Sequence, residues 1–511
     1  MTLRLTLILS AVFLFAAFAV GALFTTHACF MAGAGTRYPS LQQAIDRAEP
    51  GCTIILLGGT YEENVVVDKP LRIVPRAQSK PFAMLGQHPT GTSSVAAFID
   101  PARPSTLRAA DAERPVVEIR ASGVEIHGLR IDGGQIGIHA TEVSGVRLSN
   151  NTVNGAADAG IRFDGVRTSV LQGNAIARSP VGLDLTGSHG ISAVENAVRR
   201  NGVGIRLTYA SGNTLRGNEV SHSQSVGLRL MASSDNAIRD NAIVNNATGI
   251  VMADSTGNRL AANRLDRNDG ALRVRGSEGT HYVHEIARDN AINGRPIYYV
   301  VGAEGLTIGP DANPGYLALV RSRNVTVRGV TLPEGSQGLL MIGTRNSRIQ
   351  NVKVPASEQG LYLQDAHDNE LVNSRVERTA SSGVTLVNAS GNRLANSVVR
   401  ANEGHGVLLQ GADANSLTAN EVRDNPDSGV HISDSRGVRL TDNRIRGNWV
   451  GVYLDGGGEH RLRNNTIAKS QFAVYVERSS ANEFADNRLP ENRHLSNQPA
   501  LLDAATSEAE D

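Results

Sequence analysis

The chain has 511 residues, with 50 Lys and Arg against 50 Asp and Glu, so its formal net charge at pH 7 is zero. That balance removes the overall electrostatic attraction on which nucleic-acid binding relies, and no nucleic-acid partner is expected. Two cysteines cannot supply a disulfide-dense scaffold or a four-thiolate zinc site. Asn is abundant instead: 38 of the 39 Asn residues follow residue 149, which indicates a repeated turn that requires this residue type.

Residues 1–28 are expected to be a targeting segment. Leu5 to Phe24 carries no charge, and this run is longer than a typical signal-peptide core of about 7–15 residues and long enough to cross a membrane. Small residues at 17–19 and 26–28 offer cleavage sites, so a cleaved signal peptide and an uncleaved N-terminal membrane anchor both remain open. Either way, the rest of the chain is expected to be exported, in the periplasm, outside the cell, or anchored and facing outward.

Two cysteines follow this segment at Cys29 and Cys52. They could pair in an oxidising compartment if cleavage falls before Cys29. Two unrelated thiols are the alternative.

Residues 37–76 predict a capping helix followed by the first coils of a solenoid. Ser40 and Gln43 form a capping-box pattern, residues 41–48 carry one apolar face, and Pro50-Gly51 ends the helix. Short strands are predicted at 53–57, 64–67 and 71–74. A lone helix before a series of short strands suits a solenoid whose first edge must be covered. Residues 77–115, rich in Pro, Ser and Ala, are interpreted as an excursion from that edge.

From about 116 to 489 the sequence repeats every 22 or 23 residues. A marker Gly opens each apolar-polar-apolar stretch, at Gly137, Gly160, Gly182, Gly204, Gly227 and Gly249, and then at Gly338, Gly360, Gly383, Gly406, Gly429 and Gly451. An Asn keeps the same period, at Asn151, Asn174, Asn196, Asn218, Asn241 and Asn263, and later at Asn420, Asn443, Asn465 and Asn487.

This pattern predicts an all-β protein, a single-stranded right-handed parallel β-helix with an N-terminal capping helix. Coils would stack about 4.8 Å apart. The recurring Asn is expected to form a ladder in which each side-chain amide bonds the Asn above and below and also satisfies backbone groups of the turn.

Several segments carry a resemblance to a known superfamily. Ser40–Ile45, Pro50–Leu56 and Gly59–Asn64 are similar to the first coil of many pectin-lyase-like β-helix proteins. Asn293–Tyr299, with Gly315–Val320, resembles a cassette of NosD-like proteins, which carry the repeat of carbohydrate-binding and sugar-hydrolysing (CASH) β-helices. The resemblance covers roughly 37–490 and implies the fold. For function it implies either polysaccharide binding and modification, or a non-catalytic periplasmic accessory that matures a copper site or binds a protein partner.

Alternation along each strand predicts an outward-facing column, two residues after each marker Gly. In the first half the column reads His139, Arg162, Asp184, Arg206, Arg229, Val251 and Arg273; in the second it reads Leu340, Tyr362, Thr385, Leu408, His431, Tyr453 and Tyr475. Guanidinium groups about 4.8 Å apart repel each other unless anions lie between them. An anionic, uronic-acid polysaccharide is therefore the predicted partner, held by Arg162, Arg229 and Arg273, with Tyr362, Tyr453 and Tyr475 stacking on sugars. The alternative is a solvated face without a ligand.

Catalysis is left open by the sequence. A lyase or C5-epimerase would need a base and a cationic group, for which His139 or Asp184 and then Arg206 are the candidates. Asp365, His367 and Asp368 resemble the Asp-Pro-His-Asp signature of mannuronan C5-epimerases, although Ala replaces the Pro and the segment also matches an ordinary turn of the repeat. Gly404-His405-Gly406 resembles a polygalacturonase tripeptide, but the paired aspartates of that family are missing and hydrolysis is not expected.

No cofactor is evident from the sequence, and Ca²⁺ or Cu is implied only by the resemblance. Copper transport favours clustered Met, Cys or His, yet Met231, Met252 and Met341 fall at structural positions, and His281 and His284 would face opposite sides of a strand.

Two further segments depart from the repeat. Residues 276–337 form an irregular insertion that brings in four Tyr, and this insertion is either a binding loop or a structural bulge. Residues 490–511 are a polar, acidic tail that is expected to be disordered beyond a short cap.

Overall fold

The computed structural model describes residues 28–76 and 104–497. These residues form an all-β parallel β-helix of about 20 coils with one α-helix, α1 (Leu41–Arg47), and two 3₁₀ helices, η1 (Gly279–Tyr282) and η2 (Pro310–Ala312). The predicted fold class is confirmed. The predicted targeting segment, most of the excursion and most of the tail lie outside the described residues. No helix within the described ranges has the length and apolar character needed to cross a membrane.

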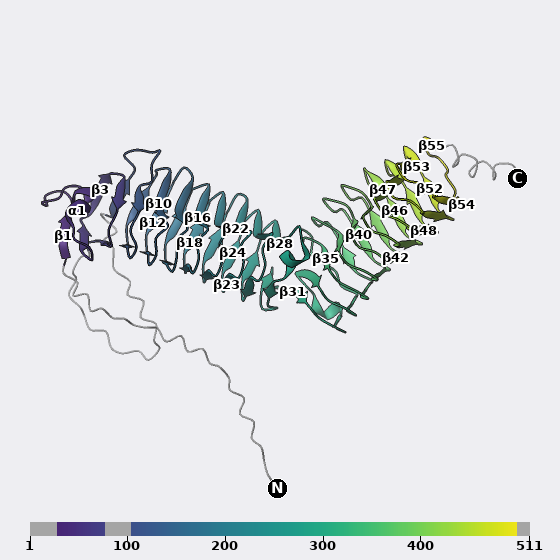
Figure 1. Cartoon of the computed structure of the whole chain (residues 1–511), viewed down its shortest axis with the longest axis horizontal. Coiled ribbons are helices and arrows are strands. Elements are labelled where there is room, and N and C mark those ends of the chain that lie inside the picture. Colours follow the sequence, from purple (N-terminus) through teal and green to yellow (C-terminus); the bar gives the residue numbers. More distant parts are fainter. Residues whose placement is uncertain (1–27, 77–103, 498–511) are drawn as a thin grey trace, which may run out of the picture.

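The coils stack into two arms that meet at an angle (Figure 1). Sheet 1 of the N-terminal arm runs from β1 (Ala28–Ala32) to β29 (Glu285–Ile286). Sheet 2 contains β3 (Gly59–Glu62), β6 (Ser105–Arg108), β9 (Arg130–Asp132), β12 (Thr152–Asn154), β15 (Ala175–Ala177), β18 (Ala197–Arg199), β21 (Glu219–Ser221), β24 (Ala242–Val244), β27 (Arg264–Asp266) and β30 (Ala291–Ile292). Sheet 3 contains β4 (Val65–Val67), β7 (Val117–Ile119), β10 (Ile136–Thr141), β13 (Ala159–Asp164), β16 (Val181–Thr186), β19 (Val203–Thr208), β22 (Val226–Met231), β25 (Thr248–Ala253) and β28 (Gly270–Arg275).

The C-terminal arm repeats this triangular coil with three further sheets. Sheet 4 contains β31 (Arg295–Val301), β33 (Tyr316–Val320), β35 (Leu339–Ile342), β38 (Leu361–Gln364), β41 (Val384–Val387), β44 (Val407–Gln410), β47 (Ser428–Ser433), β50 (Val450–Asp455), β53 (Phe472–Glu477) and β55 (His494–Ser496). Sheet 5 runs from β32 (Thr307–Ile308) to β54 (Glu483–Ala485), and sheet 6 from β37 (Lys353–Val354) to β52 (Thr466–Ala468). Neighbouring coils pair in parallel, whereas β30 and β31 pair antiparallel where the arms join.

The marker Gly marks a place where two coils pack too closely for a side chain. A Cβ at Gly160 would lie 2.5 Å from Cγ2 of Ile176 and 2.8 Å from the carbonyl oxygen of Gly182. Strand alternation then buries the next residues, as in β16, where Leu183 and Leu185 are fully buried. The Gly therefore fixes both the corner and the strand phase of each coil.

Asn ladders occupy three corners of the coil in both arms, where the sequence predicted one. The predicted ladder of the N-terminal arm runs from Asn151 to Asn290. At each step, the backbone N–H and the side-chain Nδ2 of one Asn both donate to Oδ1 of the Asn in the next coil. Shorter ladders run through Asn213, Asn236 and Asn258 and through Asn246 and Asn268. The C-terminal arm has three more, beginning at Asn369, Asn402 and Asn420.

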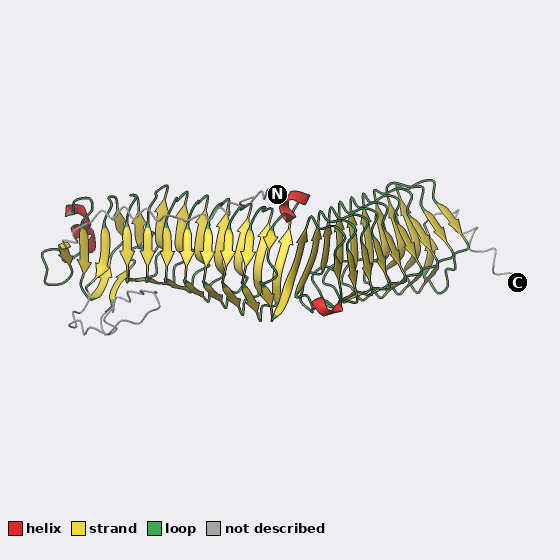
Figure 2. Cartoon of the chain, turned by 90° about the horizontal axis from the view of Figure 1, so that it is seen from below, coloured by secondary structure: helices red, strands yellow, loops and turns green. Residues whose placement is uncertain are grey.

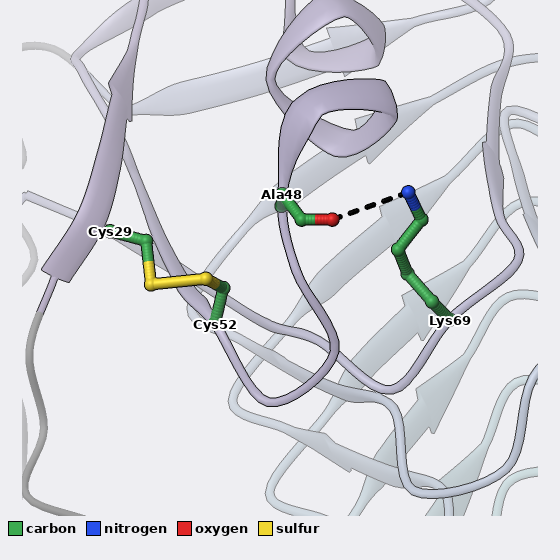
Figure 3. Close-up of a disulfide and its surroundings, with 4 residues drawn as sticks. All are labelled: Cys29, Ala48, Cys52 and Lys69. Atoms are coloured by element: carbon green, nitrogen blue, oxygen red, sulfur yellow. Dashed lines mark hydrogen bonds between the residues drawn. A yellow bond between two sulfur atoms is a disulfide. The ribbon is translucent and has the colours of Figure 1, made fainter.

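The first edge is closed by α1 and by a disulfide. Ser40 Oγ accepts a bond from the N–H of Gln43, as the capping pattern predicted, but the Glu63 carboxylate accepts the N–H groups of Leu41 and Gln42. Leu41, Ala44 and Ile45 are buried against the first coils. Cys29 and Cys52 form a disulfide, and Lys69 Nζ donates to the carbonyl oxygen of Ala48 at 3.2 Å (Figure 3).

The other end of the N-terminal arm is closed by the side of the C-terminal arm. All residues of β33 and β35 are buried, because one face of each strand belongs to each of two hydrophobic cores. Tyr316, Ala318 and Leu340 pack against the N-terminal core, while Leu317 and Met341 belong to the C-terminal core. Figure 2 shows the two short helices, η1 and η2, beside this junction.

Polar side chains replace the missing next strand at the junction. Gln337 accepts a bond from the N–H of Val274 and donates to its carbonyl oxygen, both at 2.8 Å, and the Tyr316 hydroxyl donates to Gln337 at 2.7 Å. The Glu358 carboxylate pairs with Arg273 and Arg275 at the edge of β28. Within residues 276–337, Tyr282, Tyr299 and Tyr316 are thus structural contacts between arms.

Loss of a ladder Asn should destabilise the solenoid. Asn218 makes four side-chain bonds, and Asn218→Ala would orphan the N–H of Asn196 and the carbonyl of Ala193. We expect a loss of about 2–4 kcal/mol in the free energy of unfolding, measured by urea denaturation followed by circular dichroism. Asn154→Ala, on the surface of sheet 2, is the control and should change stability by less than about 0.5 kcal/mol. Equal effects would contradict the ladder.

Acid should loosen the junction through His284, which is 3% exposed. Burial lowers the pKa of His284 to about 4, so the unfolded chain binds the proton more readily between pH 6.5 and 4. Neutral His284 therefore makes its full contribution to stability above pH 6.5, and this contribution is lost as the pH falls from 6.5 to 4. Between pH 7 and pH 4, the free energy of unfolding should therefore fall by roughly 3 kcal/mol less in His284→Phe than in wild type. The exposed His189→Phe should keep the wild-type pH dependence; an unchanged slope in His284→Phe would refute the assignment.

Candidate functional site

The predicted outward column of the first half lies along sheet 3. His139, Arg162, Asp184, Arg206, Arg229, Val251 and Arg273 occupy one register position in successive coils. Parallel pairing therefore brings these side chains into a single row, as alternation predicted.

Asp184 supplies the anion that the arginines were expected to take from a ligand. Its side chain is 1% exposed and lies between Arg162 and Arg206. Oδ2 accepts bonds from Arg162 Nε at 3.0 Å and from Arg206 Nη2 at 2.7 Å, and Oδ1 accepts Arg206 Nε at 2.9 Å. The expected repulsion is therefore relieved within the chain, and a polymer carboxylate is not needed between these two groups.

Two further carboxylates, which the sequence reasoning missed, complete this network. Asp158 pairs with Arg162 at 2.8 Å, and Asp164 bonds His139 Nε2 at 2.8 Å. The hydrogen bond to Asp184 raises the pKa of Arg206. Burial by itself would lower the pKa of Arg162, but its contacts with Asp158 and Asp184 outweigh this effect and raise the pKa. Asp164 stands four residues after the marker Gly160, so a second outward column read by the same alternation would have found it.

The network limits the chemistry of this row. Asp184 is 1% exposed, and both of its carboxylate oxygens accept hydrogen bonds from guanidinium groups, so a ligand cannot reach it. Arg206 is held by the same contact. His139 is 21% exposed and is the row's remaining candidate base, oriented by Asp164. Within the described residues, the Arg229 side chain makes a single hydrogen bond, to Ser225 at 3.4 Å, while Arg273 is engaged by Glu358 at the junction.

The outward column of the second half forms part of an aromatic platform. We use this name for six side chains: His431, Tyr453 and Tyr475 of the predicted column, Phe472 and His494 beside it on sheet 4, and His405, which lies just before β44. Their rings form a continuous series with centroid distances of 4.5–5.5 Å, including the stacked pair His431–Tyr453 at 4.5 Å. All six rings are at least partly exposed. Trp449, the only Trp in the chain, is 59% exposed and immediately precedes β50, which carries Tyr453.

Hydrogen bonds hold several platform rings in place. His405 Nδ1 accepts the N–H of Ser428 at 3.2 Å, which leaves its Nε2–H to donate to His431 Nδ1 at 3.3 Å. Burial and the neighbouring His405 lower the pKa of His431 to about 4, so this pair is neutral at pH 7. The Tyr453 hydroxyl donates to Glu477 at 2.6 Å, and this bond raises the pKa of Tyr453 to about 12.

The remaining predicted site residues lie elsewhere. Tyr362 shares the register column but packs partly against the N-terminal core, next to the junction. Asp365, His367 and Asp368 lie on the turn after β38, where His367 Nδ1 accepts the N–H of Ser390 one coil on. Because this turn belongs to the C-terminal arm, the two predicted catalytic sets do not form one site.

Removal of Asp184 should leave two uncompensated guanidinium groups. We expect Asp184→Ala to lower the free energy of unfolding by about 2–4 kcal/mol, somewhat less than for a fully buried pair because both arginines are partly exposed. Sulfate should restore part of this loss by replacing the carboxylate. Asp158→Ala, at a more exposed pair, should cost less than about 1 kcal/mol. A neutral or stabilising Asp184→Ala would show that the row does not depend on this anion.

Known proteins resemble the chain at several levels. A cell surface glycoprotein of Methanothermus fervidus is 30% identical over 132 residues, which is 25% of this chain and 18% of that relative, so the chain spans less than a fifth of its length. Among solved structures, the periplasmic alginate epimerase AlgG is 10% identical with a TM-score of 0.26 over 77% of both chains. Pectate lyase Pel9A is 13% identical with a TM-score of 0.32, over 66% of this chain and 78% of the lyase.

A family model gives the assignment. The model described as "Periplasmic copper-binding protein (NosD)" matches residues 106–302 and 289–498, which together span more than three quarters of the 511 residues. The chain belongs to the NosD family.

Proposed function

We propose that this protein is an exported β-helix protein of the NosD family that binds a polysaccharide along the aromatic platform. The observation that carries the proposal is the continuous series of partly exposed rings on the last coils of sheet 4. Three His, two Tyr and one Phe lie in contact on this face, and their partial exposure suits a role beyond packing.

The platform suits sugars for a physical reason. The C–H groups of a pyranose face are weakly positive and apolar, and they pack against the negative face of an aromatic ring. The rings of His431, Tyr453 and Tyr475 lie in successive coils at centroid distances of 4.5 and 5.4 Å, so an extended chain of sugars could meet one ring after another. Glu477 accepts the Tyr453 hydroxyl and Asp455 pairs with Arg478, so the second oxygen of each carboxylate is the one that can accept hydrogen bonds from sugar hydroxyls.

Export is part of the proposal. The disulfide between Cys29 and Cys52 is of the kind that persists in oxidising compartments outside the cytosol. The family is described as periplasmic, and the relative from Methanothermus is a cell surface glycoprotein. These observations support a location beyond the cytoplasmic membrane.

The copper of the family description does not match the residues described. Within residues 28–76 and 104–497, no group of three or more His, Cys, Asp or Glu could hold a metal ion. Both Cys are in the disulfide, and Met252 and Met341 are buried in the cores as expected. The structural position expected for Met231 is wrong, because its side chain is 43% exposed at the end of β22. The His405–His431 pair uses three of its four ring nitrogens in contacts with each other and with Ser428.

Binding is favoured over modification by the same geometry. A lyase or epimerase acting on uronic acids needs a free base close to an available cation. Asp184 and Arg206 are engaged with each other, and His139 is the one candidate base left in the row. The alternative is a non-catalytic accessory protein that binds a protein partner on the platform, and the experiment must distinguish it from a polysaccharide-binding protein.

The proposal predicts that platform rings govern affinity for a polysaccharide. Alginate, pectate, a glycosaminoglycan and a neutral glucan would be titrated by calorimetry, with ultraviolet absorbance and NMR to detect lyase products or epimers. The double variant Tyr453→Ala/Tyr475→Ala should weaken binding of the preferred polymer at least tenfold, because each stacking contact is worth about 1 kcal/mol. Tyr453→Phe should retain most of the affinity, since it keeps the ring.

Tyr209→Ala is the matched control, because Tyr209 is 72% exposed and lies on the N-terminal arm. It should bind like wild type. If no polymer binds, or if the double variant binds as tightly as wild type, the proposed function is wrong.

A further inference from the structure

A shallow hollow of about 250 Å³ lies on sheet 2 of the N-terminal arm, away from both the charged row and the platform. Its floor consists of short side chains, Ala175 and Ala177 on β15 and Ala197 on β18, with Thr152 and Asn154 on β12 beside them. Parallel pairing places these residues in adjacent register positions of three successive coils. Longer side chains stand in the same columns on either side, so the floor is a local depression in the sheet.

Arginines surround this floor on three sides. Arg130 occupies the column of Thr152 one coil earlier, Arg199 follows Ala177 one coil later, and Arg178 lies at the rim in the turn after β15. Four coils are involved, so the hollow is about 14 Å long along the solenoid axis. Its dimensions suit a short oligosaccharide better than a single small ion.

The charges of the rim are unequal. Arg130 is paired with Asp132 at 2.8 Å, and Arg199 is paired with Glu219. Arg178 is exposed, and its side chain makes no hydrogen bond or ion pair with the described residues. One guanidinium group therefore remains free to bind an anion in a hollow that otherwise offers apolar floor and hydroxyl and amide groups.

We infer that this hollow is a second saccharide site, specific for an acidic sugar whose carboxylate is held by Arg178. A guanidinium group binds a carboxylate through two parallel N–H···O bonds, which fixes the orientation of the bound group. The Ala floor lets the sugar ring approach the sheet backbone, and Thr152 and Asn154 offer partners for its hydroxyl groups. The site deepens the proposed function by naming a charged sugar class, but it lies on the other arm from the platform.

The test uses oligogalacturonate and its methyl-esterified form, which has the same rings without the charge. Both would be titrated into the full chain carrying Tyr453→Ala/Tyr475→Ala, so that platform binding does not contribute. We expect oligogalacturonate to bind at least tenfold more tightly than its ester, and Arg178→Ala to remove this preference. Ala197→Leu should abolish binding of both forms by filling the floor.

Two matched variants control for charge and volume. Arg216→Ala removes an exposed arginine from sheet 1, and Ala242→Leu enlarges a residue in the column of Ala197 two coils beyond it, outside the hollow. Both should bind like the parent. Equal affinity for the two oligomers, or an Arg178→Ala variant that binds as Arg216→Ala does, would overturn the inference. If the hollow does not bind oligogalacturonate but the platform binds a polysaccharide, the proposed function still holds. If the platform does not bind but the hollow does, the second site still holds.

Discussion

The stacked Asn side chains at the corners of the coil are the interaction on which the rest of the structure depends. A coil of short strands turns sharply three times, and each turn buries backbone groups that no sheet can pair. In the ladders, one Asn amide satisfies the backbone of its neighbour, reaches a carbonyl in the coil before, and bonds the next Asn. Because each coil is completed by the next, the strands keep a constant phase, and side chains at one repeat position form rows along the surface.

A solenoid built in this way must cover its two ends, and the chain covers the end of its first arm with part of itself. The outward face of β33 and β35 becomes a lid for the N-terminal core, and Gln337 pairs with Val274 as a further strand would. The bend in the molecule follows from this arrangement, since the second stack begins across the end of the first (Figure 1). Tyrosines that the sequence left open as binding residues are used for this closure.

The two rows generated by the repeat have taken different chemical roles. On sheet 3 the charges are compensated internally, with Asp184 between two arginines, so the row resembles a set of structural ion pairs. On sheet 4 the rings are partly exposed and contact each other. His431 and Tyr453 stack on one another, so a ligand would meet their exposed edges and the ring faces that do not lie in this stack. The Ala floor of sheet 2 adds a third kind of surface, where the repeat has omitted bulk and one arginine remains unpaired. The charged row, the platform and the Ala floor differ because the same periodic backbone carries different outward-facing residues at each place.

The sequence by itself determined the coil, its 22- or 23-residue period, the inward and outward positions and the first Asn ladder, because each of these follows from spacing along the chain. His139, Arg162, Asp184 and Arg206 were correctly placed in one row for the same reason. What sequence spacing could not decide is which neighbours neutralise each other. Asp164 bonds His139 from the next coil, 25 residues along the chain, and Asp158 pairs with Arg162 four residues later in its own coil, so no single spacing identifies these partners. The bend, the burial of Leu340 and the hollow on sheet 2 were decided only by the tertiary structure, because they depend on how the two arms pack and on side chains that are near in space but 20 or more residues apart in sequence.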